Sequence, residues 1–281
     1  LFRRLFRLPG RAAIDCLTSI ASASGIAVLV TESQYNRSYY TVREACTITC
    51  NFSLVSIPFA LLVAEVAGIP TLFFGWYGAV LLACLLCAVV LSRIAPLARL
   101  PDRTIDGDAT PEGDEPVSLA VAWEAALARA ARGPGPRDYL RQALRNFAVN
   151  ACGVIPPSMA AATLAAILLF HSPVVSTLTW PLAEALRLLG IAEAVNVANA
   201  MVIGFADQFM PALVANQVDA RFWKFVLAGL AVSQVIFMSE FCILVLRSPL
   251  PLGLLQLAWL FLLRTLLTLP VLLLFAALIT G

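Results

Sequence analysis

Long apolar runs dominate the chain and predict helices that cross a membrane. A crossing helix needs about 20 mostly apolar residues. The runs that reach this length are Thr41–Val66, Ile69–Leu91, Ala151–Phe170, Arg221–Leu246 and Leu252–Thr280. The last run is long enough to tilt, or to kink at Pro270. The pattern predicts an all-α polytopic membrane protein with about five full crossings.

Two further segments are apolar but interrupted midway by Gly, Ser, Asp or Pro. Residues Arg11–Gln34 read RAAIDCLTSIASASGIAVLVTESQ, and residues Ala194–Gln217 read AVNVANAMVIGFADQFMPALVANQ. Lipid cannot satisfy the N–H and C=O groups of irregular backbone, so such breaks must be sheltered by protein or line a water-filled cavity. Both segments are expected to be re-entrant hairpins or broken helices.

The two interrupted segments and the helices after them lie in register with each other. A shift of 183 residues places Gln34 on Gln217, Asn51 on Gln234, and Ser56 on Ser239, and it aligns two aromatic pairs. The identities between the halves are about as many as this composition gives by chance. The order of features predicts an internal repeat: an interrupted segment, a glutamine, an aromatic pair, and a helix with polar residues at mid-membrane depth.

Counting crossings makes these repeats inverted, because the predicted helices at 41–66 and 221–246 run in opposite directions. We therefore divide the chain into a first repeat at 1–92, a hydrophilic loop with one amphipathic helix at 93–150, and a second repeat at 151–281. The crossing at 151–170 has no counterpart in the first half. Together with Leu1 in place of Met, this leads us to expect that a start precedes Leu1.

Composition supports a membrane location and places the loop. The chain is 60 % hydrophobic and 13 % charged, whereas soluble domains carry about 25 % charged residues. The net charge of +2 gives no reason to expect a nucleic-acid partner. Ten arginines fall on the face of the loop, and only Arg187, Arg221 and Lys224 fall on the other. The positive-inside rule predicts a cytoplasmic loop in a bacterial-type inner membrane.

Three stretches together resemble YjiH-type membrane proteins with nucleoside-recognition GATE domains. They are LPGRAAIDCLTSIASASGIAVLVTESQYNRSYYTVREA, MVIGFADQFMPALVANQ and FLLRTLLTLP. The resemblance covers the chain in order apart from residues 101–138. It implies a transporter-like helical fold, with nucleosides or nucleobases as a substrate class. The wider group also contains ferrous iron transporters and spore maturation proteins, so fold analogy alone leaves the cargo open.

Charged residues at membrane depth are the candidates for function, since each costs about 2.5 to 3.5 kcal/mol at a helix centre. Asp207 lies in the second interrupted segment beside Gln208 and shortly before Pro211. As a helix cap, Asp207 would satisfy backbone N–H groups. As a ligand, it would bind a coupling cation, Na⁺ or H⁺, or a substrate hydroxyl. In this interpretation Pro211 frees a carbonyl group at the break.

Glu240 and Arg264 lie at matching depths in consecutive antiparallel crossings, which predicts a structural ion pair or a gate. The remaining candidates for substrate or ion binding are polar residues of the interrupted segments and of the helices after them: Glu32, Gln34, Asn51, Ser56, Gln217 and Ser239, with Asp15 as a further charged residue. Hydrogen bonding between helices is the alternative role for Asn51 and Ser56.

No Walker loop, zinc-protease motif or nucleophile elbow occurs, so the sequence supports neither a catalytic site nor a resident cofactor or metal. The first hypothesis is a secondary transporter of a small polar solute, with a site near the midplane between the repeats. The alternatives are a divalent metal-ion permease, using Cys46 and Cys50 with carboxylates, and a membrane scaffold that transports nothing. Association into homo-oligomers stays open.

Overall fold

The computed structural model describes residues 2–21, 24–107, 123–124, 127–128, 131 and 135–281. Its regular elements are all helical: α1 (Phe2–Phe6), α2 (Ala12–Ala21), α3 (Ser24–Tyr35), α4 (Val42–Phe52), α5 (Ile57–Val66), η1 (Pro70–Leu72), α6 (Phe73–Leu91), η2 (Leu97–Arg99), α8 (Pro136–Phe170), α9 (Val174–Leu188), α10 (Ala194–Ile203), α11 (Met210–Asn216), α12 (Arg221–Ser233), η3 (Met238–Cys242), α13 (Ile243–Arg247) and α14 (Leu254–Thr280). In this part of the chain four segments are long and apolar enough to cross a membrane, or five if one bent pair is a span. The protein is therefore an all-α polytopic membrane protein, as predicted.

Both interrupted segments form helical hairpins. Helices α2 and α3 pack against each other, and so do α10 and α11. In the second hairpin Pro211 lies in the first turn of α11, where a missing N–H group breaks no helical hydrogen bond. Pro211 thus starts a helix, rather than freeing a carbonyl as the sequence suggested. The prediction of broken segments is confirmed.

The first crossing, Val42–Val66, is itself broken at residues 53–56. A capping box starts α4, in which the Glu44 carboxylate accepts the Thr41 N–H group at 3.0 Å and the Thr41 hydroxyl accepts the Glu44 N–H group at 3.3 Å. Pro58 lies in the first turn of α5. Its ring would clash with the carbonyl of Leu54 in a continuous helix, which gives the break a local cause.

The crossing at Arg221–Arg247 is broken at residues 234–237, although no proline lies there. Val235 adopts φ 59°, a conformation that is costly for a β-branched residue. The chain resumes in the π-helical turn η3. Contacts with the second hairpin hold this break open: the N–H groups of Met238 and Ser239 donate to the carbonyls of Phe205 and Ala206 at 2.7 and 3.2 Å.

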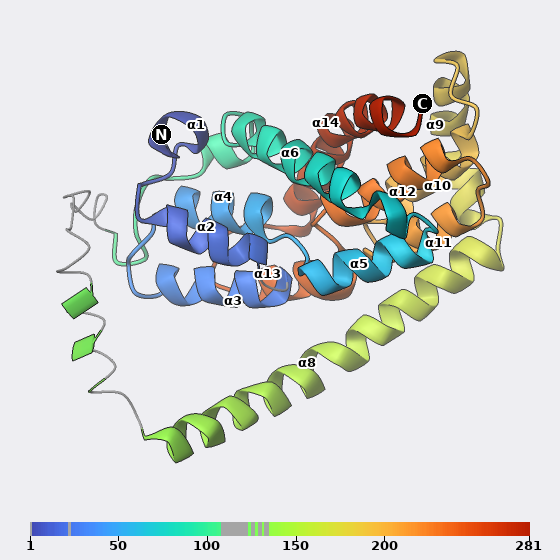
Figure 1. Ribbon diagram of the computed structural model, residues 1–281. Coiled ribbons are helices and arrows are strands. Elements are labelled where there is room, and N and C mark those ends of the chain that lie inside the picture. The colour runs from blue at the N-terminus through green and yellow to red at the C-terminus, as the bar shows by residue number, and fades with distance from the viewer. Residues whose placement is uncertain (1, 22–23, 108–122, 125–126, 129–130, 132–134) are drawn as a thin grey trace.

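The two halves repeat the same order with opposite direction (Figure 1). Each half has a hairpin, a broken crossing and a long helix: α2–α3, α4–α5 and α6, then α10–α11, α12–α13 and α14. The crossing formed by α4 and α5 runs antiparallel to the one formed by α12 and α13, and the hairpins lie at opposite ends of the bundle. The packing is also reciprocal, because α3 contacts η3 and α13 while α11 contacts α5.

The segment before the second hairpin differs from the prediction. Helix α8 is one helix of 35 residues that begins at Pro136, fifteen residues before the expected start. Helix α9 was not foreseen, and it is bent by 66° from residues Ile155–Phe170 of α8. Only together are these two segments long and apolar enough to form one membrane span. The amphipathic helix expected at 118–132 lies largely outside the described residues.

Each hairpin should have both of its ends on one membrane face. Single cysteines at Gly10 and Asn36, in a variant without the native cysteines, are expected to react with an impermeant maleimide from one face. Cysteines at Ala192 and Gln217 should react from the opposite face. Labelling of the two ends of either hairpin from different faces would contradict the re-entrant topology.

Candidate functional site

The two breaks leave the carboxyl-terminal ends of half-helices inside the protein. Helix α4 ends at Phe52 and α12 ends at Ser233. The last four carbonyls of any helix lack intrahelical partners, and lipid offers none. Buried carbonyls at these two ends therefore need donors from elsewhere in the fold.

Arg264 on α14 supplies those donors. Its side chain is fully buried. Nε donates to the Ser233 carbonyl at 2.6 Å, and Nη1 donates to the Cys50 carbonyl at 3.1 Å. The Asn51 side-chain and main-chain oxygens lie 3.4 and 3.5 Å from Nη1 and Nη2. Cys50 and Ser233 are 183 residues apart, so one guanidinium binds equivalent positions of the two repeats.

The predicted ion pair between Glu240 and Arg264 is wrong. Matching depth along two helices does not fix which way the side chains face, and the break at 234–237 turns Glu240 toward the first hairpin. The Glu240 carboxylate accepts the backbone N–H group of Gly25 in the first turn of α3. A Cβ atom on Gly25 would lie 2.1 Å from Glu240 Oε1, so only glycine permits this approach.

Asp207 joins the second hairpin to the second break. Its Oδ1 accepts the N–H group of Phe209, the N-cap of α11, at 2.9 Å, and its Oδ2 accepts the Ser239 hydroxyl at 2.7 Å. The Asp207 and Glu240 carboxylates also interact electrostatically. Asp207 therefore satisfies a backbone N–H group in the turn before α11, although the N-cap of that helix has no side-chain capping bond. The same half-buried carboxylate stands beside two other predicted site residues, Ser239 and Glu240.

Several buried polar atoms near the breaks lack hydrogen-bond partners among the described residues. They include Gln208 Nε2, Gln234 Oε1 and Ser53 Oγ. The amide nitrogen Nε2 of Gln234 donates to the carbonyl of Met201 at 3.3 Å and to the hydroxyl of Thr265 at 3.2 Å. Buried polar groups are normally paired, so these unpaired donors and acceptors single out the breaks as candidates for contact with a polar ligand or water.

Three predicted site residues lie away from this centre. Glu32 and Gln34 belong to the last turn of α3, about 10 to 14 Å along the helix from Gly25 at 1.5 Å per residue. Gln217 is the exposed C-cap of α11. The repeat pattern paired Gln34 with Gln217, and both residues lie at the outer ends of the hairpins and not at the tips.

The other candidates lie in structural surroundings and do not form a second site. Ser56 is the half-buried N-cap of α5 and makes no side-chain capping bond. Asp15 accepts the Tyr40 hydroxyl at 2.5 Å, and burial together with this bond raises the pKa of Tyr40 above its ordinary value. Cys46 and Cys50 are buried. No group of three or more His, Cys, Asp or Glu side chains suited to a metal occurs in the described part of the chain.

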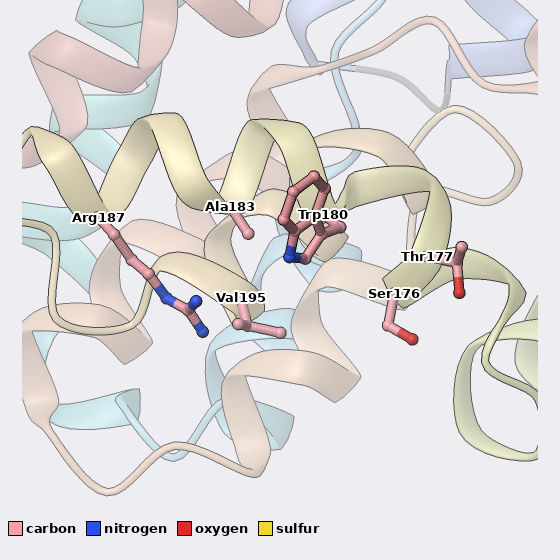
Figure 2. A pocket seen from close by; sticks show the side chains of 6 residues that line it. All are labelled: Ser176, Thr177, Trp180, Ala183, Arg187 and Val195. Atoms are coloured by element: carbon pink, nitrogen blue, oxygen red, sulfur yellow. The ribbon is translucent and has the colours of Figure 1, made fainter.

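Sequence reasoning missed two features of helices α8 and α9. The Ser158 hydroxyl on α8 donates to the Ser239 carbonyl, which attaches α8 to the second break. On α9, Trp180 and Arg187 flank an open pocket of about 410 Å³ (Figure 2). Its other lining residues are Ser176, Thr177, Ala183 and Val195. None of these belongs to a break, so the pocket lies on the flank of the bundle and not at the central site.

The protein is a multi-pass helical membrane protein with two oppositely oriented hairpins, two broken crossings and a polar centre. An uncharacterized protein of Alkalihalophilus pseudofirmus is 38 % identical over 277 residues, which covers 96 % of this chain. The chain spans 59 % of that relative's length. No family model matches the chain, and no solved structure does. The comparisons supply no substrate, so the chemistry must be inferred from the site.

The contact between Gly25 and Glu240 gives a direct test of the site's packing. Gly25→Ala should displace the Glu240 carboxylate and lower the free energy of unfolding by about 1 to 3 kcal/mol, the usual cost of overpacking. Thermal unfolding of the purified protein measures this. Gly78→Ala is the matched control, because no atom lies within 4 Å of its Cβ position and alanine favours a helix. Equal stability of the two variants would contradict the packing described.

Proposed function

We propose that the protein is a secondary transporter of a small polar solute. The observation that carries this proposal is the convergence of two hairpins and two broken crossings, from opposite faces, on one polar centre. In inverted-repeat transporters, discontinuous helices form the substrate and ion sites near the midplane, and access alternates by motion of the repeats around them.

The chemistry of the centre favours a solute with both donors and acceptors of hydrogen bonds. Asp207 and Glu240 provide acceptors, while the unpartnered amide of Gln208 provides donors. Nucleosides and nucleobases carry both kinds of group, and the sequence resemblance implies the same class. We therefore place them first among substrates, with H⁺ or Na⁺ as the coupling ion and the arginine-rich loop face in the cytoplasm of a bacterial-type inner membrane.

Uptake into proteoliposomes tests the proposal. Labelled nucleosides and nucleobases should accumulate under an imposed H⁺ or Na⁺ gradient, and empty liposomes should accumulate none. Accumulation of Fe²⁺ or Zn²⁺ instead would favour a metal permease. Failure with every solute, together with a partner that copurifies in fixed proportion, would favour a membrane scaffold.

Asp207→Asn separates a ligand role from a role in holding the turn before α11. Asparagine keeps the side chain's size and can still accept the Phe209 N–H group, so the protein should purify folded with a nearly unchanged thermal midpoint. Transport should fall about tenfold or more, because a contact with a charged group contributes roughly 1.5 to 3 kcal/mol. Asp219→Asn, at an exposed position beyond α11, is the matched control. Normal transport and ion dependence in Asp207→Asn would remove Asp207 from the coupling site.

A further inference from the structure

The carbonyls that bind Arg264 are of the kind that hold coupling cations in broken-helix transporters. Unwound carbonyls and the carboxyl-terminal ends of half-helices coordinate Na⁺ there, because the helix dipole places partial negative charge at that end. In this protein the carbonyls of Cys50 and Ser233, from equivalent half-helices, both accept hydrogen bonds from one guanidinium.

The positive charge of Arg264 is balanced by the carboxyl-terminal ends of α4 and α12, without a carboxylate. Each helix end carries roughly half a negative elementary charge, so α4 and α12 together offset about one positive charge. None of the ion pairs among the described residues includes Arg264. A buried charge without compensation is costly, so the two helix ends are its counterion.

We propose that Arg264 is a tethered cation that fills the place of a coupling ion between the two repeats. It holds the ends of α4 and α12 together and leaves Na⁺ no place among these carbonyls. The consequence for coupling rests on the proposed transport function: a coupling ion must bind elsewhere, with Asp207 and Glu240 as the carboxylates nearest the hairpin tips. The consequence for stability does not depend on transport.

One arginine serves both repeats. The position equivalent to Arg264 in the first repeat is Leu81, on α6. The guanidinium has five donors in a planar fork, which lets a side chain from one repeat reach carbonyls in both. A second cation here would exceed the charge that the two helix ends offset.

Removal of the side chain should create a site for a free cation. Arg264→Ala is expected to lower the thermal midpoint of the purified protein, and low-millimolar guanidinium chloride should raise it again by about 5 °C or more at saturating concentration. Choline chloride at equal ionic strength should not. Leu260→Ala, one turn earlier on α14 and also fully buried, leaves a cavity without removing charge. Guanidinium should not stabilise Leu260→Ala, and equal responses of the two variants would overturn the proposal.

A second pair of variants decides the matter if Arg264→Ala does not fold. Arg264→Lys keeps the charge and three donors, whereas Arg264→Met keeps a similar length and removes both. The lysine variant should give the higher folded yield and thermal midpoint. A methionine variant as stable as the lysine variant, or more stable, would show that the site needs packing and not a cation. Both measurements are made without substrate, so they stand or fall independently of the transport assay.

Discussion

The burial of helix ends inside an apolar protein is the constraint on which the rest of this structure depends. Two crossings stop midway, and each leaves carbonyl groups that neither lipid nor its own helix can satisfy. Arg264 meets both ends with one side chain. Because the bonded carbonyls belong to equivalent residues, the same contact ties the two repeats together at the centre of the fold.

The amino-terminal ends of the hairpin helices are also matched to charge, here to carboxylates. Amino-terminal ends carry partial positive charge and favour anions. Glu240 accepts an N–H group in the first turn of α3, and Asp207 accepts the N–H group of Phe209, which precedes α11. Cation and carboxylates are thus distributed by helix polarity, which explains how the protein contains three charged side chains here without a direct ion pair.

This distribution also makes the repeats chemically unequal. Asp207, Glu240 and Arg264 all belong to the second half, and the first half has Ser24, Ile57 and Leu81 at the equivalent positions. The first half contributes backbone instead, through the carbonyls of Cys50 and Asn51 and the N–H group of Gly25. At this site one repeat therefore provides the charges and the other provides the backbone groups that face them.

The sequence by itself determined the features that depend on local chemistry. Apolar length predicted the crossings, and the interruptions at 11–34 and 194–217 predicted the hairpins. The break in the first crossing also has a local cause, Pro58. Tertiary structure decided the rest. The break at 234–237 contains no helix breaker, and backbone pairing with Phe205 and Ala206 holds it. Depth along the chain suggested that Glu240 faces Arg264, but the direction of a side chain depends on helix rotation and packing. As packed, Arg264 binds the carbonyls at the two helix ends, and Glu240 contacts Gly25.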